Sequence, residues 1–148
     1  MTKLTHKQMI NAPIGKIWRI LANLEALEQY DPTVKSARCI SAIGEGIGAK
    51  RKVNMLDGKN WFEEKVTEWE PGKALCYQLT DCSFPIEGLK HSYSFEHAGE
   101  QTIVTQEMIY TVKFGMFGRM MDSLMIRKQT SSGVKKFFEC LKKYAEIQ

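Results

Sequence analysis

Arg51 and Glu64 are the two residues whose types and spacing offer the clearest chemistry. A hairpin turn at "LDGK" (56–59), in which the two ends of the turn pair, places Arg51 directly opposite Glu64 on one face. Because burying one charge alone is costly, we expect the two residues to form an ion pair. The pair has three candidate roles, ranked in this order: ordering the sheet, anchoring a carboxylate, hydroxyl or carbonyl group of a ligand, and catalysis. Catalysis ranks last, because Glu64 would have to act as a general base and an adjacent arginine lowers the pKa of a carboxylate.

Other polar side chains share the inner face of the same predicted sheet. A second tight turn, "EPGK" (70–73), brings Tyr77 to this face, and the next hairpin adds His91, Tyr93 and Gln106. A histidine here could move a proton near neutral pH, but a single histidine on an apolar face is more often a packed core residue. The strand residues that we predict to contact a ligand are Arg51, Val53, Phe62, Glu64, Tyr77, Leu79, His91, Tyr93, Gln106 and Met108.

The rest of the sequence carries no recognised catalytic or metal-binding pattern. There is no G-x-S-x-G, no P-loop and no histidine–glutamate metal motif. The glycines of "GEGIGAKR" (44–51) are spaced G-x-G-x-G before a strand-like run, whereas a dinucleotide loop needs G-x-G-x-x-G before a helix. We therefore interpret them as a tight connection between two antiparallel strands. Cys39, Cys76, Cys82 and Cys140 are scattered without a C-x-x-C, which predicts buried free thiols in a reducing cytoplasm, and we expect neither a metal nor a cofactor.

Length and composition are those of one soluble domain. The chain has 148 residues, of which 43% are hydrophobic and 26% are charged. Its net charge of +4 is spread along the chain, which argues against nucleic-acid binding and leaves open a slight attraction to an anionic membrane surface. The first residues, "MTKLTHKQMINAP", lack the apolar stretch of a signal peptide, and no apolar run approaches the ~20 residues that span a bilayer. We therefore expect a cytoplasmic protein without stable membrane insertion, and the sequence does not indicate its oligomeric state.

Apolar periodicity and turn residues predict the order of the elements that position these side chains. A first strand is followed by a helix at "NAPIGKIWRILANL", with Asn11 as N-cap and Pro13 in the first turn. A short helix at about 24–30 ends at a "DP" pair, and a long helix at about 116–146 closes the chain. The strand register places Trp69 on the outer face of the sheet. The predicted strands are 2–10, 34–42, 47–56, 59–69, 74–81, 89–97 and 102–113.

The long helix carries an interrupted apolar stripe. Its apolar positions are spaced by threes and fours, but Arg127 and Ser131 stand on the same side at mid-helix. Four of the chain's eight methionines lie in its N-terminal part, where these flexible side chains could either adapt to an apolar ligand or fill a loose core. The stripe consists of Met116, Met120, Leu124, Val134, Phe138, Leu141 and Ala145, and the helix residues predicted to contact a ligand are Met120, Met121, Leu124 and Arg127.

Several stretches together resemble the START-like, helix-grip (SRPBCC) superfamily, in particular its polyketide cyclase/dehydrase and lipid-transport group. The stretches are "INAPIGKIWRIL", "GEGIGAKRKV", "DGKNWFEEKVTEWEPGKALCYQL" and "FGRMMDSLM…FFECLKKYAE", which follow in this order and cover nearly the whole chain. The resemblance implies a single START-like domain at 1–148 with an α+β helix-grip fold. In that fold a curved seven-stranded antiparallel sheet wraps around a long C-terminal helix, and two short helices follow the first strand.

Members of this superfamily hold a hydrophobic ligand between sheet and helix, but one fold serves several functions. The resemblance therefore implies a carrier or sensor that binds a small hydrophobic or amphipathic molecule, lipid or polyketide-like, in an internal cavity. The alternative is a polyketide cyclase/dehydratase-like enzyme in which Arg51, Tyr77 or His91 polarises a carbonyl group of the ligand. A third hypothesis is an interaction module that uses its surface and not its cavity.

Overall fold

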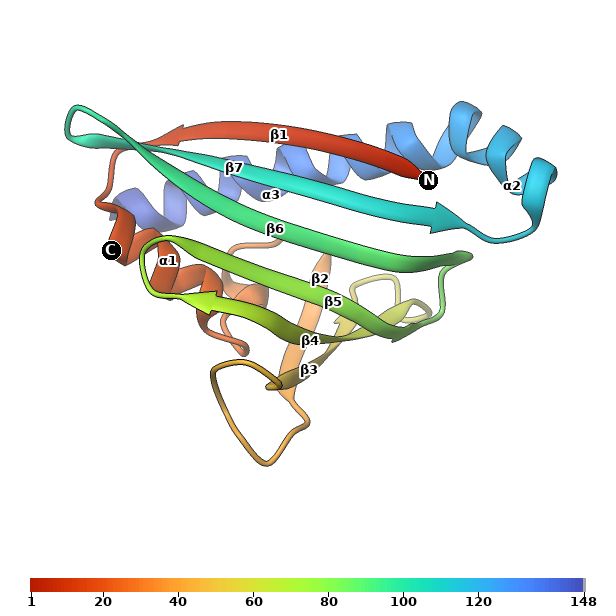
Figure 1. The fold of residues 1–148 in the computed structure, drawn as a ribbon, viewed down its shortest axis with the longest axis horizontal. Helices are drawn as coiled ribbons and strands as arrows, with labels where there is room; N and C mark the ends of the chain where they lie inside the picture. The colour runs from red at the N-terminus through yellow and green to blue at the C-terminus, as the bar shows by residue number, and fades with distance from the viewer. Residues whose placement is uncertain (148) are drawn as a thin grey trace.

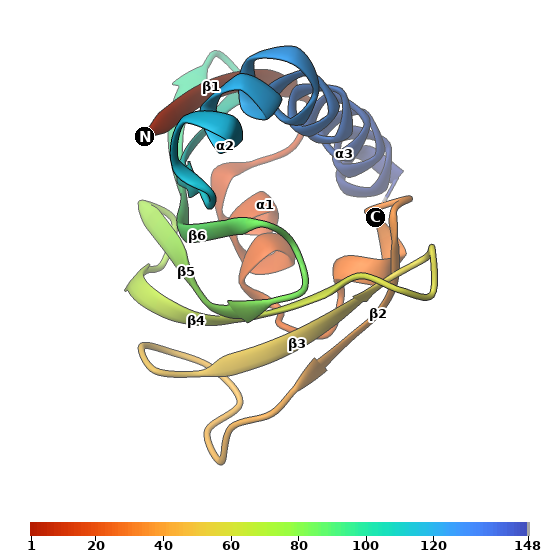
Figure 2. The same ribbon diagram turned by 90° about the vertical axis from the view of Figure 1, so that its right-hand side faces the viewer.

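A curved sheet wrapped around a long helix forms the body of the molecule. The computed structural model describes residues 1–147, without the side chains of residues 123 and 124. Within this range, seven antiparallel strands form one sheet in the order β1-β7-β6-β5-β4-β3-β2. Figure 2 shows the sheet curling so that α3 (Arg127–Ile147) closes its open side, which confirms the expected α+β helix-grip fold. The strands are β1 (Thr2–Ile10), β2 (Val34–Cys39), β3 (Lys50–Met55), β4 (Trp61–Glu70), β5 (Ala74–Cys82), β6 (Ile86–Ala98) and β7 (Gln101–Val112).

The hairpin register that brings Arg51 opposite Glu64 is confirmed in the pairing of β3 with β4. The turn between these strands is not the tight type I′ form, which needs two residues with positive φ. In this loop Gly58 has a φ of 74°, and Asp57 before it has a negative φ. Asp57 instead stabilises the loop, because its carboxylate accepts hydrogen bonds from the backbone N–H groups of the two residues after Gly58, at 2.8 Å each.

The glycine-rich stretch connects the antiparallel strands β2 and β3, as predicted, but the connection is not tight, because residues 40–49 lie between the two strands. Gly46 and Gly48 have φ values of 86° and 92°, a left-handed conformation that glycine adopts without steric cost. The backbone N–H of Gly48 donates to the carbonyl of Val66 at 2.9 Å, which attaches the end of the loop to β4.

The helical segments differ from the sequence prediction at three places. α1 (Ile14–Ala22) begins beyond the proposed cap Asn11 and has no side-chain cap. The second short helix is a single 3₁₀ turn, η1 (Leu27–Gln29). Figure 1 shows α2 (Gly115–Met121) and α3 in succession along one side of the molecule, and the segment between them, η2 (Asp122–Ile126), is π-helical. A π-helical turn holds more residues than an α-helical turn, so a stripe with α-helical spacing does not continue across it.

A β-bulge moves Trp69 from the outer face of the sheet to its inner face. The pairing of β4 with β5 shifts between Val66 and Glu68, and an extra residue in a strand reverses the facing of the side chains after it. Trp69 packs against the core and meets Trp18 of α1 edge-to-face, with ring centroids 4.9 Å apart. The predicted outward placement of Trp69 is therefore wrong. Its packing closes the end of the sheet that holds α1, and Figure 1 shows α2 at the opposite end.

Candidate functional site

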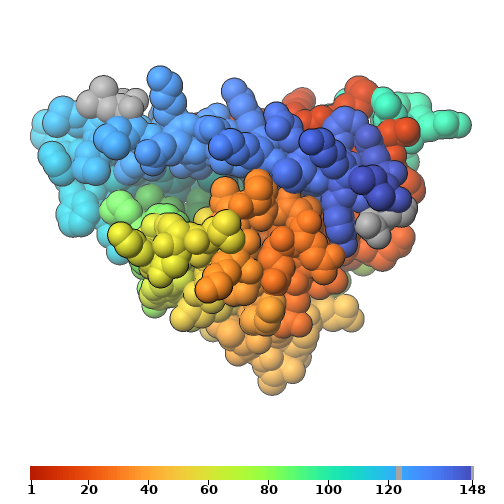
Figure 3. Space-filling view, turned by 180° about the vertical axis from the view of Figure 1, so that it is seen from behind, coloured from red at the N-terminus to blue at the C-terminus, as the bar shows by residue number. Residues whose placement is uncertain are grey.

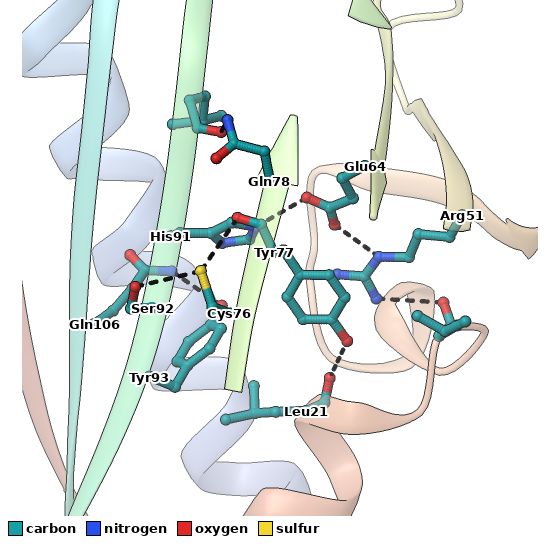
Figure 4. Close-up of polar contacts among 12 residues, drawn as sticks. Leu21, Arg51, Glu64, Cys76, Tyr77, Gln78, His91, Ser92, Tyr93 and Gln106 are labelled. Atoms are coloured by element: carbon teal, nitrogen blue, oxygen red, sulfur yellow. Dashed lines mark hydrogen bonds and ion pairs between the residues drawn. The ribbon is translucent and has the colours of Figure 1, made fainter. Parts of the chain in front are cut away.

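Arg51 and Glu64 form a buried ion pair on the concave face of the sheet. Nε of Arg51 donates to Oε1 of Glu64 at 2.7 Å, and the two residues are 2% and 1% exposed. Nη1 of Arg51 also donates to the carbonyl of Leu24 at 3.3 Å, and the guanidinium lies 4.3 Å from the centre of the Tyr77 ring. Figure 4 shows the Tyr77 ring beside the guanidinium and the carboxylate of Glu64 beyond it. The pair therefore joins two strands to the segment after α1.

His91 extends the ion pair into a network of three residues. Its Nε2 lies 2.8 Å from Oε2 of Glu64, so both carboxylate oxygens have partners. Burial alone would raise the pKa of Glu64, but the charge of Arg51 and then His91 outweigh it and lower this pKa to about 2. Glu64 is therefore ionised at neutral pH and is a poor general base, as the neighbouring arginine predicted.

Two buried tyrosines and Gln106 are the other polar groups on this face. The Tyr77 hydroxyl donates to the carbonyl of Leu21 at 2.7 Å, and Nε2 of Gln106 donates to the Tyr93 hydroxyl at 3.0 Å. Burial raises the pKa of Tyr77 to about 12 and also raises the pKa of Tyr93, so both hydroxyls remain protonated. Oε1 of Gln106 differs from these groups, because it is buried and has no hydrogen-bond partner among the described residues.

His6 lies beside Gln106 and has a similar unpaired atom. The two residues are register partners on β1 and β7. Nε2 of His6 lies 3.0 Å from the Ser131 hydroxyl, whereas its Nδ1 is buried without a partner in the described part of the chain. Burial, followed by the charge of Lys135, lowers the pKa of His6, so its imidazole is neutral at neutral pH. His6 and Gln106 thus offer adjacent polar atoms that no described side chain satisfies.

Three apolar side chains on the concave face are not fully covered. Phe62, Leu79 and Met108 are each half-buried, whereas the inward-facing residues two positions away on the same strands, toward α1, are buried. A filled core would bury these three apolar side chains as well. The face therefore has an incompletely covered apolar part at these three positions, whereas Tyr110, beyond Met108 toward α2, is buried.

The helical segment around η2 passes over this part of the sheet. The Tyr110 hydroxyl donates to the Asp122 carboxylate at 2.6 Å, and His6 contacts Ser131. Met108 lies between these two attachment points in the pairing of β1 with β7. The residues between Asp122 and Ser131 therefore pass over the part of the sheet that holds Met108.

An open hollow of about 500 Å³ lies between this helical segment and the residue that precedes β2. Figure 3 shows a recess below the blue helix, beside the orange residues before β2 and the yellow β3–β4 hairpin. Its volume is within the range of small-molecule sites, and its lining combines an apolar side chain with lysines and uncharged polar groups. The lining residues are Thr33, Met125, Lys128, Gln129, Ser132, Gly133 and Lys136.

The strand residues that we predicted to contact a ligand share the concave face. The helix residues predicted to contact it do not share one face. Met116 and Met120 are exposed, so the prediction of an inward-facing stripe is wrong at these two positions because the helix changes its turn at η2. Met121 is half-buried and Arg127 is exposed. The predicted contact Leu124 lies outside the side chains that the structure describes.

Sequence reasoning missed the lining of the hollow and the role of Asp122. Except for Thr33, the lining residues stand between the apolar positions of the helical stripe, where a polar residue ordinarily indicates solvent. Asp122 is buried and accepts hydrogen bonds from the hydroxyls of Thr2 and Tyr110. A single acidic residue inside the apolar run "GRMMDSLMI" is the signal that could have found it, because carboxylates are rarely buried without partners.

The described residues do not present the elements of a metal site. No group of three or more His, Cys, Asp or Glu side chains among them is arranged to hold a metal ion. The four cysteines are free thiols, as their scattered spacing predicted, but the prediction that they are buried is right only for Cys76, because the other three are partly exposed. In the same part of the chain, no helix is both long and apolar enough to cross a bilayer.

Comparisons with known proteins show the family through a family model and the fold through solved structures. The family model described as polyketide cyclase/dehydrase and lipid transport matches residues 1–146. Similar solved structures include the XoxI protein of Bacillus cereus, with 15% identity and a TM-score of 0.79 over 98% of this chain and 96% of that chain. A protein of Thermus thermophilus has 19% identity and a TM-score of 0.79 over 96% of this chain and 95% of that chain. A START superfamily protein of Mycobacterium smegmatis has 16% identity and a TM-score of 0.79 over 97% of each chain.

These low identities show a common fold and nothing finer. No curated protein matches the chain. The match of the family model, which spans residues 1–146, covers the sheet, the hollow and the helix that borders it. The chain belongs to the polyketide cyclase/dehydrase and lipid transport family.

Proposed function

We propose that this protein binds a small hydrophobic or amphipathic molecule, lipid or polyketide-like, as a carrier or sensor. The apolar body of the ligand lies against Phe62, Leu79 and Met108, and its polar end lies at the hollow beside α3. The proposal is supported by two observations, the half-buried apolar side chains on the concave face and the open hollow beside the helix that packs on the sheet.

The lining of the hollow favours a ligand with an acidic or hydroxylated head group. Lys128 and Lys136 lie about two turns apart on the same helix and supply positive charge. Thr33, Gln129 and Ser132 supply hydrogen-bonding groups, and no acidic side chain is among the described lining residues. A carboxylate or phosphate at this place would gain from both lysines, while the apolar part of the ligand leaves water.

The Arg51–Glu64–His91 network supports a binding role more than a catalytic one. Arg51 and Glu64 satisfy each other, so a ligand does not have to neutralise an unpaired buried charge. The side chain of His91 is 13% exposed, which makes it the member of the network that a ligand could reach.

A cyclase- or dehydratase-like enzyme is the second candidate, and His91 is the observation that favours it. A partly exposed imidazole that is hydrogen-bonded to a carboxylate is oriented for proton transfer. His91→Gln separates the candidates when a linear poly-β-ketone is offered. A carrier should show an altered affinity for this compound and no chemical conversion, whereas an enzyme should convert it and lose that turnover in the variant while binding persists.

Binding of cis-parinaric acid, a fluorescent fatty acid, tests the proposal directly. Gly133→Trp fills the hollow, because Gly133 lines it and a Cβ added there meets nothing within 4 Å. Lys143→Trp places the same indole on an exposed position of α3 and is the matched control. We expect the wild type and the control to bind the probe alike, and Gly133→Trp to bind it about tenfold more weakly or worse, the equivalent of ~1.4 kcal/mol.

A chain-length series of saturated fatty acids adds a second readout. Each methylene that leaves water contributes about 0.8 kcal/mol, which corresponds to roughly a fourfold gain in affinity. Affinity that does not rise with chain length would contradict an apolar site. Binding that Gly133→Trp leaves unchanged would contradict this location in the molecule.

A further inference from the structure

The surface of α2 and η2 carries a cluster of uncovered apolar side chains. Five large apolar residues at positions 114–125 are between 54% and 84% exposed. Single exposed apolar residues are ordinary on protein surfaces, but a contiguous group of them marks an interaction site. The five are Phe114, Met116, Phe117, Met120 and Met125.

The backbone around α2 holds these side chains away from the body of the protein. Gly118 is the buried residue of α2, and a Cβ at this position would lie 1.9 Å from the carbonyl oxygen of Lys113. Phe114 has a φ of 75°, a left-handed conformation that a bulky residue rarely adopts. The close approach directs the glycine side of α2 inward, so that Phe117 and Met120 face solvent.

Asp122 fixes the position of the segment after α2. Its buried carboxylate accepts hydrogen bonds from the hydroxyls of Thr2 on β1 and Tyr110 on β7. Burial and then the bond to Asp122 raise the pKa of Tyr110, so this hydroxyl stays protonated and keeps donating. The attachment to two strands keeps the apolar cluster at the surface.

The same segment is strongly basic. Lys113, Arg119, Arg127 and Lys128 are all exposed there. The acidic residue of the segment, Asp122, is buried and its carboxylate lies 4.0 Å from Nη2 of Arg127, so it offsets the charge of Arg127 alone. Lys113, Arg119 and Lys128 remain as positive charge at the surface. A second copy of the chain would bring two basic surfaces together, which like-charge repulsion opposes, whereas an anionic surface is complementary to them.

We propose that these exposed apolar and basic side chains form one docking surface, which binds an anionic lipid bilayer. Its apolar side chains enter the boundary between headgroups and acyl chains, and its basic side chains contact the anionic headgroups. Met125 and Lys128 belong to both the docking surface and the lining of the hollow, so docking brings the hollow to the bilayer. The inference rests on exposure and charge, and it holds whether or not the hollow takes a ligand. The docking surface consists of Phe114, Met116, Phe117, Met120 and Met125 with Lys113, Arg119 and Lys128.

Flotation with vesicles tests the docking. Vesicles of phosphatidylcholine alone are compared with vesicles in which about a third of the lipid is phosphatidylserine. We expect at least about tenfold tighter binding to the anionic vesicles, because each basic residue near such a surface contributes ~1 kcal/mol. Binding should weaken as salt is added, because salt screens charges that lie in water.

Paired variants locate the surface on the molecule. Phe117→Ser with Met120→Ser removes two exposed apolar side chains without touching the core, and we expect about tenfold weaker binding. Ile43→Ser with Ile47→Ser removes two exposed apolar side chains from the β2–β3 loop and should leave binding unchanged. Figure 1 shows this loop projecting from the molecule away from α2.

A charge variant and a measurement of self-association complete the test. Arg119→Gln with Lys128→Gln should weaken binding to the anionic vesicles about tenfold or more. Wild-type protein that does not float with anionic vesicles would overturn the proposal, as would an equal loss in the loop variant and the α2 variant. Self-association in sedimentation that the α2 variant abolishes, without vesicle binding, would assign the surface to a second copy and also overturn it. Circular dichroism verifies that each variant is folded.

Discussion

Replacing Arg51 by methionine leaves Glu64 as a buried carboxylate without its cation, and the structure indicates the size of the effect. Burial raises the pKa of Glu64, yet Arg51 and then His91 lower it from 4.5 to about 2. That shift corresponds to roughly 3 kcal/mol, and removing one partner of a buried ion pair typically costs about 3–5 kcal/mol. We expect the free energy of unfolding to fall by about 3–5 kcal/mol, which in a domain of this size lowers Tm by about 10 °C.

Urea unfolding at neutral pH, followed by tryptophan fluorescence, measures this loss. The double variant Arg51→Met with Glu64→Gln removes both charges and should be more stable than the single variant, because no buried charge is left unpaired. Lys50→Met, at the adjacent exposed position of β3, is the control and should change stability by less than about 0.5 kcal/mol. The reasoning is refuted if Arg51→Met lies within about 1 kcal/mol of the wild type, or if the double variant is the less stable of the two.

Glu64 should also make the stability of the wild type depend on acid. The pKa of Glu64 is about 2 in the folded protein and 4.5 ordinarily, so its contribution to the free energy of unfolding is complete above about pH 4.5 and is lost as the pH falls toward 2. Urea titrations of Glu64→Gln should not show this loss. Gly118→Ala should displace α2 and speed its hydrogen exchange, because the new Cβ would lie 1.9 Å from a carbonyl oxygen. By contrast, the Cβ of Gly133→Ala meets nothing within 4 Å, so this variant should stabilise α3 by up to about 1 kcal/mol. Tyr110→Phe removes a donor to the buried carboxylate of Asp122 and should lower the free energy of unfolding by about 1–3 kcal/mol; unchanged hydrogen exchange in α2 and η2 would contradict the anchoring role.

Turn residues and side-chain alternation were enough to predict the sheet and its ion pair. Because side chains alternate with a period of two, one correctly placed hairpin determines the face of every residue on both of its strands. Arg51 and Glu64 are placed by the turn at 56–59 for this reason. Trp69 shows the limit of the argument, because the bulge between Val66 and Glu68 has no compositional signal and reverses the facing of the later residues of β4.

The C-terminal helix shows a second limit. An apolar stripe predicts one buried face only if the number of residues per turn is constant, and the π-helical segment changes that number at Asp122. The spacing of apolar residues therefore could not predict that Met116 and Met120 are exposed. The same spacing could not predict the hollow. The size of the hollow depends on the distance between helix and sheet, which is determined by contacts between residues far apart in the sequence.

Methionine-methyl NMR in the presence of cis-parinaric acid shows directly whether a ligand lies between the concave face and the hollow. Of the chain's eight methionines, Met108 lies on the half-buried face, Met125 lines the hollow, and Met9 is exposed on β1. We expect ligand-to-methyl nuclear Overhauser effects at Met108 and Met125 that saturate at one ligand per chain, with Met9 unaffected. Effects confined to the exposed Met116 and Met120, with none at Met108, would contradict it.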